Sequence, residues 1–312
     1  MRAARIAGRA GVFMVTLALV VLFSIVSPVF LRLSNFVNIG RQITLLAVAS
    51  YAMTFVIISG EIDLSVGPVA SLVGILVAMA LAAGVGTAAA VTIGLGAGLA
   101  VGVAIGVLVV YGEIPSFIAS LGAFSIARGV AFAITDGRAV AILDIRYLYT
   151  FAEATPLGIP ATIWYAALAF VVLHLLLSKT TFGARVYAIG GNAAAARYSG
   201  IAVRRTRLTV FVLDGALVAL SGILLSARLG TGFVDGARNL ELDAIAAVVL
   251  GGTSFLGGTG SLVRTISGVL LIGVLNNGLN LLNVPTYYQI SLKGVIIVVS
   301  VALDQYARRR RG

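Results

Sequence analysis

The chain contains uncharged apolar stretches that are too long for a water-soluble core. No charged residue occurs between Asp63 and Glu113, and none occurs between Arg9 and Arg32. A helix needs roughly 20 apolar residues to cross about 30 Å of hydrocarbon, so the first stretch has room for two spans. Soluble domains are about 25% charged, whereas this chain is 11% charged and 60% hydrophobic. These stretches predict an all-α, polytopic integral membrane protein.

The breaks between apolar stretches predict about ten membrane helices in one transmembrane domain that covers residues 1–312. The N-terminal stretch lacks a small-residue cleavage site after Val26, so we interpret it as a retained first helix rather than a signal peptide. The expected spans are residues 11–31, 43–60, 65–84, 86–111, 115–135, 161–178, 208–227, 241–256, 261–282 and 289–307.

The distribution of Lys and Arg predicts the orientation of these spans. With both termini cytoplasmic, fourteen basic residues face the cytoplasm, six face the other side, and Arg128 and Lys293 lie within spans. Cytoplasmic loops carry the excess of positive charge, so this is the favoured arrangement. It places loop 179–207 inside and loop 136–160 outside. The net charge of +11 is then explained by topology and anionic lipid, without a nucleic-acid partner.

Two pairs of short segments indicate an internal repeat. Glu61-Ile62-Asp63 opens the third span and Glu241-Leu242-Asp243 opens the eighth. Ile114-Pro115-Ser116-Phe117 opens the fifth span and Val284-Pro285-Thr286-Tyr287 precedes the tenth. Repeats of five helices have opposite orientations in a membrane, so the spacing predicts a 5+5 inverted repeat.

The common catalytic motifs are absent from the sequence. There is no G-x-x-x-x-G-K-[ST] loop to bind ATP phosphates, and the single His excludes H-E-x-x-H. No G-x-S-x-G occurs, and the chain has no Cys for thiolate metal sites. We therefore expect no catalytic residues, no metal and no cofactor of its own.

Polar residues within apolar spans are candidates for a solute pathway, because a charge in mid-membrane costs at least about 2.5–3.5 kcal/mol. We expect Asp63 and Arg128 to share one buried polar network; the alternative is that Asp63 only caps its helix. The amides of the ninth span suit a polyhydroxylated solute or, equally, hydrogen bonds between helices. The candidate pathway residues are Asp63, Ser65, Arg128, Asn276, Asn277 and Asn280.

Five ordered segments resemble the permease subunits of ribose- and xylose-type bacterial ABC sugar importers, over about residues 40–305. The segments are Gly60-Glu61-Ile62-Asp63-Leu64-Ser65-Val66-Gly67, Ile114-Pro115-Ser116-Phe117-Ile118 with Ser125-Ile126-Ala127-Arg128-Gly129, Phe182 to Asn192 with Ala196 to Ile201, Glu241 to Ser254, and Asn276-Asn277-Gly278-Leu279-Asn280.

The resemblance implies import of a monosaccharide across the bacterial inner membrane by a homodimer of this chain. It also implies a cytoplasmic ABC ATPase subunit, which uses the ATP, and a periplasmic sugar-binding protein, which selects the sugar. The loop that couples to the ATPase would include Gly183, Arg185, Gly190, Gly191, Asn192, Arg197, Ser199 and Gly200.

The sequence departs from the family pattern at two places. Glu61 replaces a glycine, and Ala193 and Ala194 stand where family members often carry Glu-Glu. An ion-coupled secondary transporter is the alternative reading, with the Glu-x-Asp carboxylates as coupling sites, and a passive channel is a third. Neither explains the long basic loop, which favours the importer.

Overall fold

The computed structural model describes residues 2–309. Met1 and residues 310–312 lie outside the described part, and these include Arg310 and Arg311, two of the fourteen basic residues assigned above to the cytoplasmic side. The described chain is helical apart from one short strand pair. In chain order the elements are α1 (Arg2–Val26), α2 (Leu33–Ile58), α3 (Val66–Ala82), α4 (Thr87–Val110), α5 (Ser116–Thr135), β1 (Val140–Ala141), α6 (Ile145–Leu148), η1 (Tyr149–Glu153), η2 (Pro156–Gly158), α7 (Ala161–Lys179), α8 (Thr181–Gly191), α9 (Ala193–Tyr198), α10 (Val203–Leu229), β2 (Thr231–Gly232), α11 (Leu240–Leu250), α12 (Leu262–Leu281) and α13 (Thr286–Arg309).

The expected all-α membrane character is confirmed, but the expected number of spans is not. Among the described residues six helices are long and apolar enough to cross a membrane: α2, α4, α5, α7, α10 and α12. Two apolar helical segments are shorter: Gly11–Val26, which is the later part of α1, and Val66–Ala82, which is α3. The eighth expected span, residues 241–256, contains only the 11-residue helix α11, and the chain then turns irregularly up to α12.

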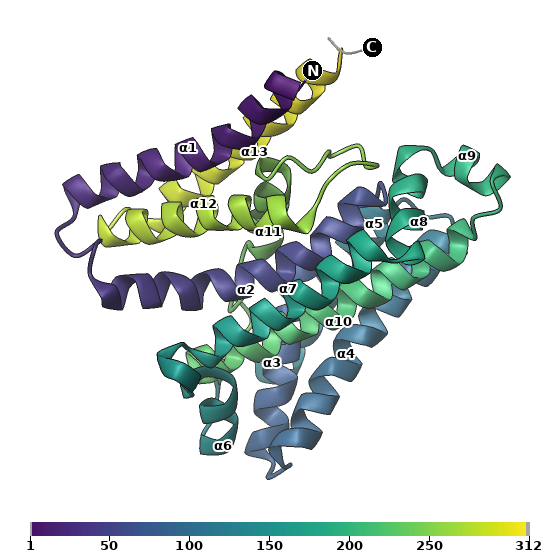
Figure 1. The fold of residues 1–312 in the computed structure, drawn as a ribbon. Coiled ribbons are helices and arrows are strands. Elements are labelled where there is room, and N and C mark those ends of the chain that lie inside the picture. Colours follow the sequence, from purple (N-terminus) through teal and green to yellow (C-terminus); the bar gives the residue numbers. More distant parts are fainter. Residues whose placement is uncertain (1, 310–312) are drawn as a thin grey trace.

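Helices α2 and α10 form the centre of the bundle and contact one another. Helix α10 also packs along α3 and α4, while α2 packs against α7, α11 and α12 (Figure 1). The largest buried side chains lie mainly on these central helices, among them Phe55 on α2 and Phe211 on α10. Helix α1 packs on α12 through a separate apolar cluster that includes Phe23 and Leu275.

The packing partners of α3 and α11 follow one pattern. Helix α3 contacts α4, α5 and α10, whereas α11 contacts α12, α13 and α2. The two sets correspond when α2 is exchanged for α10, α4 for α12 and α5 for α13. An inverted repeat of five helices predicts this correspondence.

Helices α3 and α11 are both short, and an irregular segment precedes each. At 1.5 Å per residue, α11 is only about 16 Å long, roughly half the thickness of a bilayer core. The segment before α11 contacts α3: the backbone N–H of Ala237 donates to Ser71 Oγ over 3.0 Å. A Cβ at Gly67 would collide with the Glu241 carboxylate and with the Ala237 carbonyl oxygen. The two helix N-termini therefore adjoin inside the bundle.

The long loop 136–160 is ordered and covers one end of the bundle. Strand β1 pairs with β2 in antiparallel register, Val140 opposite Gly232. Tyr147 is fully buried, and its hydroxyl donates to the Ile223 carbonyl oxygen on α10 over 2.7 Å. The Trp164 indole donates to the Pro156 carbonyl oxygen within the same cap.

Close backbone contact joins α4 to α10. A Cβ at Gly102 would overlap the Phe211 carbonyl oxygen and lie 3.0 Å from the Cα atom of Gly215, and a Cβ at Gly98 would overlap the Gly215 carbonyl oxygen. The row of glycines four residues apart on α4 thus has the packing role that such rows have in membrane helices.

We predict that Gly102→Ala destabilises the protein by about 1–3 kcal/mol, because the added methyl group has no space at this contact. Gly96→Ala is the matched control, since Gly96 lies on the same helix with nothing within 4 Å of an added Cβ. Unfolding of the detergent-extracted variants measures both changes. Equal stability of the two variants would contradict the α4–α10 contact.

Candidate translocation site and cytoplasmic surface

Buried carboxyl groups collect where the N-termini of α3 and α11 adjoin. Asp63 and Asp214 are each only 2% exposed, and Glu241 is also buried. Asp63 Oδ1 accepts the backbone N–H of Ser65 over 2.6 Å, just before α3 begins. The Asp214 side chain on α10 lies near that of Asp63. Helix N-termini carry partial positive charge and so favour carboxylates at this place.

The expected network between Asp63 and Arg128 is wrong. Arg128 Nη2 on α5 lies 2.9 Å from Asp235 Oδ1, and the two side chains are 40% and 44% exposed. The guanidinium also lies 6.0 Å from the centre of the Phe132 ring. The loop before α11 folds back against the bundle and supplies the carboxylate for Arg128. Asp63 Oδ1 instead accepts a backbone N–H just before α3, which is the kind of contact that the alternative expected.

The three asparagines of α12 have different partners. Asn277 and Asn35 exchange two hydrogen bonds of 2.9 and 3.0 Å between α12 and α2. Asn280 Oδ1 accepts from Gln289 on α13. Asn277 and Asn280 thus form hydrogen bonds between helices, which was the alternative to a role in a solute pathway.

Asn276 belongs to a buried charged cluster. Its Nδ2 donates to Asp243 Oδ2 over 3.3 Å, and Lys293 Nζ on α13 lies 2.8 Å from the same oxygen. The side chains of Lys293 and Asp243 are only 13% and 14% exposed. The cluster links α11, α12 and α13, and it explains why a lysine is tolerated within an apolar helix.

A cavity of about 150 Å³ lies between α2, α10, α12 and the start of α11. Of the six predicted pathway residues only Asn276 lines it. Ser221 is a lining residue that the sequence did not reveal, since one serine in an apolar helix carries no distinctive signal. The lining residues are Gln42, Ile43, Leu45, Leu46, Ser221, Leu225, Arg228, Gly236, Ala237, Arg238, Leu240, Asp243, Gly273 and Asn276.

The predicted coupling loop folds into two short helices, α8 and α9, at one end of the bundle. The Asn192 side chain caps α9 by accepting the backbone N–H of Ala195 over 3.0 Å, and Gly200 turns the chain at positive φ after α9. Ser199 Oγ donates to the Ala195 carbonyl oxygen. Arg185 and Arg197 are exposed. The loop thus presents a structured, basic surface.

Helix α8 is joined closely to the ends of two other helices. A Cβ at Gly190 would overlap the Ile58 carbonyl oxygen at the end of α2 and the backbone nitrogen of Gly258. The Gly258 N–H itself donates to the Ile58 carbonyl oxygen over 2.9 Å. The Tyr187 hydroxyl donates to the Gly260 carbonyl oxygen over 2.9 Å. Displacement of α8 would therefore act directly on α2 and on the loop before α12.

The Tyr187 hydroxyl stays protonated at physiological pH, so it can donate the hydrogen bond to the Gly260 carbonyl oxygen. Burial raises the pKa of the Tyr187 hydroxyl above its ordinary value, and the nearby Arg264 partly opposes the rise. A higher pKa favours the protonated phenol, which is the form that can donate to a carbonyl oxygen.

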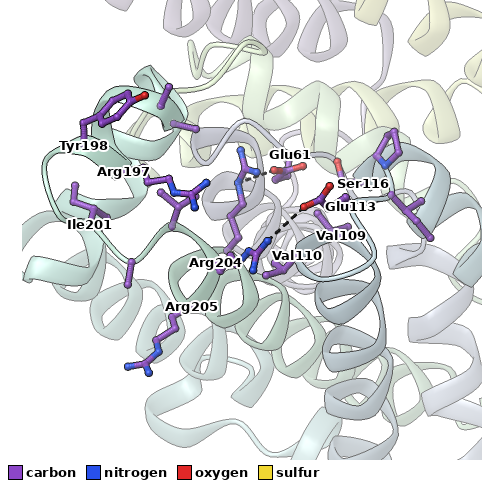
Figure 2. Close-up of a pocket in the computed structure, with 17 residues that line it drawn as sticks. Glu61, Val109, Val110, Glu113, Ser116, Arg197, Tyr198, Ile201, Arg204 and Arg205 are labelled. Carbon is purple, nitrogen blue, oxygen red and sulfur yellow. Dashed lines mark hydrogen bonds and ion pairs between the residues drawn. The ribbon is translucent and has the colours of Figure 1, made fainter.

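A cleft of about 1190 Å³ opens beside α9, with arginine side chains on one wall and glutamates on the other (Figure 2). Glu61 Oε1 lies 2.9 Å from Arg207 Nε, so the charge that departs from the family pattern has a counter-charge on α10. Arg204 and Glu113 form a more exposed pair of 3.4 Å. The lining residues are Glu61, Val109, Val110, Glu113, Ile114, Pro115, Ser116, Ala193, Ala194, Arg197, Tyr198, Ile201, Ala202, Val203, Arg204, Arg205 and Arg207.

We predict that the two ion pairs near α11 contribute unequally to stability. Lys293→Gln or Asp243→Asn alone should cost about 3–5 kcal/mol because each leaves a buried group without its partner, and the double variant should recover part of that loss. Arg128→Gln and Asp235→Asn should couple by only about 0.2–1 kcal/mol, since both side chains are partly exposed. Double-mutant cycles on unfolding of the extracted protein measure both couplings. Equal coupling in the two pairs would overturn this assignment.

Comparison with known proteins gives the relationship of the chain. A family described as branched-chain amino acid transport system / permease component matches residues 35–301. The chain is 45% identical to the ribose import permease protein RbsC of Bacillus subtilis over 296 residues, which cover 95% of this chain and 92% of that protein. No solved structure matches the chain at a significant level.

Two further relatives also match over nearly their whole length. A probable ABC transporter permease protein, YphD of Escherichia coli, is 43% identical over 93% of this chain and 87% of its own length. The L-arabinose transport system permease protein AraH of Escherichia coli is 35% identical over 98% of this chain and 93% of its own length. Together with the span-length helices, these matches make the chain a multi-pass inner-membrane protein and a membrane component rather than a catalytic enzyme. It belongs to the permease family that matches residues 35–301 and, within it, to the ribose-type permease subunits of ABC sugar importers.

Proposed function

We propose that this chain forms the membrane pathway of an importer for a monosaccharide, driven by ATP hydrolysis in a separate subunit. The observation that carries the proposal is the similarity to ribose and L-arabinose permeases across 92–98% of the chain. The sequence contains no phosphate-binding loop, so we assign ATP hydrolysis to a separate subunit. A neutral sugar also suits the amide, carboxylate and hydroxyl groups around the cavity.

The proposed architecture has ten membrane helices in two inverted halves of five. The matching contacts of α3 and α11 support this arrangement, and so do the Glu-x-Asp segments, one just before α3 and the other in the first turn of α11. Short helices whose N-termini meet inside the bundle are typical of inverted-repeat transporters, which bind solute at the interface of their halves.

The proposed orientation places both termini, α8 and α9 in the cytoplasm. In Figure 1 the start of α1, the end of α13 and the α8–α9 segment lie toward the right of the view, and α6 lies toward the opposite end. The excess of Lys and Arg on the α8–α9 side supports the same orientation. Loop 136–160 would then face the periplasm.

The proposed partners are an ABC ATPase on the cytoplasmic side, a sugar-binding protein on the periplasmic side and a second copy of this chain. Tyr198 at the end of α9 is 93% exposed, and Arg197 beside it is exposed as well. Tyr and Arg are the residue types that most often dominate protein–protein binding energy. We therefore assign α9 as the main contact for the ATPase, with anionic lipid near the remaining basic residues.

An ion-coupled secondary transporter is the second candidate, and one observation favours it. Asp63 and Asp214 are each only 2% exposed inside the bundle, and intramembrane carboxylates serve as proton relays in transporters. The two functions differ in their energy source, which transport measurements separate directly.

We predict the topology from single cysteines, which are clean probes because the chain contains no Cys. In intact cells a membrane-impermeant thiol reagent should label Leu143→Cys in the outer loop, where Leu143 is largely exposed. It should label Ala194→Cys on α9 only after the inner membrane is permeabilised. The reverse result would invert the proposed orientation.

We predict that proteoliposomes containing this chain, its ATPase and its binding protein take up D-ribose or L-arabinose only when ATP is supplied to the ATPase. Uptake should be insensitive to a protonophore, and the purified chain alone should hydrolyse no ATP. Uptake that collapses with the protonophore and ignores ATP would favour the ion-coupled alternative.

The same assay tests the docking surface. Gly191→Arg and Tyr198→Ala should each reduce uptake and co-purification of the ATPase severalfold, while the fold is kept. An added Cβ at Gly191 meets nothing within 4 Å, so a side chain can begin there without displacing a neighbouring atom. Tyr287→Ala is the control, because this tyrosine is also exposed (63%) but lies in the first turn of α13, on a different element from α9. Normal assembly of both docking variants would refute the role of α9.

A further inference from the structure

We propose that a cavity between α2, the end of α10 and loop 136–160 binds one phosphatidylethanolamine headgroup. The lipid phosphate lies between Arg41 and Arg228, and the lipid ammonium lies against Glu153. The cavity has a volume of about 340 Å³, and all three side chains line it. This inference goes beyond the proposed function, because it depends on neither the transported solute nor the energy source.

Two arginine side chains meet at this cavity without a counter-charge from the protein. Arg41 lies on α2 and Arg228 in the last turn of α10, and they lie close enough for their charges to repel one another. Neither takes part in an ion pair within the part of the chain that the structure describes. Both side chains are partly buried. Like charges that are partly removed from water are unfavourable together, so we expect an external anion between them.

The cavity lies at the depth of the lipid phosphate groups. Helix α10 ends at Leu229 and α7 begins at Ala161, and both helices are long and apolar enough to cross a membrane. Residues at these two helix ends contribute to the cavity walls. The ends of spans lie in the headgroup region. Trp164, the fourth residue of α7, is of the residue type that is enriched at this level.

The chemistry of the two arginines favours phosphate. A guanidinium is planar and always charged, and its fork of N–H donors matches the oxygens of a phosphate group. Two guanidiniums around one cavity can therefore hold one phosphate from two sides. In the headgroup region of a bilayer, the phosphate of the lipids themselves is the most abundant group of this kind.

Glu153 decides which headgroup fits best. Its exposed carboxylate lines the same cavity, and no ion pair joins it to either arginine in the described residues. The carboxylate repels a simple anion, but it can accept hydrogen bonds from a primary ammonium, which has three N–H donors. Phosphoethanolamine carries both the phosphate and this ammonium. Phosphatidylcholine has no N–H on its quaternary nitrogen, and phosphatidylglycerol has no cation.

The size of the cavity agrees with one headgroup. Its volume of about 340 Å³ is at the lower end of the 300–1,000 Å³ of small-molecule pockets. A headgroup bound there would join α2 to the end of α10 and to loop 136–160. A ligand that binds only the folded state stabilises it by mass action, so the lipid should stabilise this end of the bundle.

Lipid-dependent unfolding of the full-length chain, delipidated in a non-ionic detergent, tests the site. Phosphatidylethanolamine should raise the unfolding temperature more than phosphatidylcholine or phosphatidylglycerol at the same concentration. Native mass spectrometry should show phosphatidylethanolamine retained severalfold more often than the other two lipids. Equal effects of the three lipids in both measurements would overturn the proposal.

Substitutions at the cavity test the role of each charge. Arg41→Gln and Arg228→Gln should each reduce retention of phosphatidylethanolamine severalfold, because each removes a charged contact to the phosphate. Glu153→Gln should remove the preference for phosphatidylethanolamine over phosphatidylglycerol. Arg146→Gln is the matched control, because Arg146 is exposed on α6 in the same loop but does not line the cavity. An equal loss of lipid in the control would show a general surface attraction and refute the site.

Other sources of negative charge give different results. Inorganic phosphate that stabilises the delipidated chain as well as phosphatidylethanolamine does would indicate a site for free phosphate and overturn the headgroup assignment. Arginine variants that retain lipid normally but no longer bind the sugar-binding protein would assign these residues to protein docking instead.

An internal partner for the arginines is tested without any lipid. Arg228→Gln should then be at least as stable as the wild-type chain, because it relieves the repulsion from Arg41. A marked loss of stability in Arg228→Gln that Glu153→Gln reproduces would show that Glu153 neutralises the arginine, and it would refute the lipid site.

Discussion

The fold depends on satisfying backbone hydrogen bonds where the chain is irregular inside the helix bundle. A bilayer offers no water for unpaired N–H groups, so side chains or neighbouring helices must accept them. The segment before α3 meets this requirement with two oxygens: Ser116 Oγ accepts the Ile62 N–H, and Asp63 Oδ1 accepts the Ser65 N–H. Before α11, Ser71 Oγ accepts the Ala237 N–H. These contacts allow two short helices to begin next to one another within an otherwise continuous bundle.

The irregular segment before α3 also connects the surface formed by α8 and α9 to the interior. Helix α8 touches the end of α2 at Ile58, where that segment begins. Glu61, two residues before Asp63, is held by Arg207 on α10. A partner that moves α8 would therefore move a backbone that leads directly to the buried carboxyl groups. The glutamate that departs from the family pattern therefore has its counter-charge within the same connection.

The two ion pairs near α11 differ in their contribution to stability because they differ in solvent exposure. Arg128 and Asp235 are partly exposed, so solvent competes for both groups and the pair can form or open at little cost. Lys293 and Asp243 are mostly buried, and neither can lose its partner without a large penalty. The buried pair consequently fixes the geometry of α11 against α12 and α13, next to the cavity.

The sequence by itself determined the membrane character, the approximate position of most helices, the basic loop and the family. These properties depend on local runs of apolar residues and on short ordered motifs, which the chain carries whatever its packing. The tertiary structure alone decided the polar partners: Arg128 meets Asp235, and Asn277 meets Asn35, 242 residues away. Hydropathy shows that a polar residue lies in a span, but the rotation of the helix and its packing determine which side chain becomes its hydrogen-bond or ion-pair partner. The same limit applies to α11, because a short helix that begins inside the bundle needs fewer apolar residues than a full span.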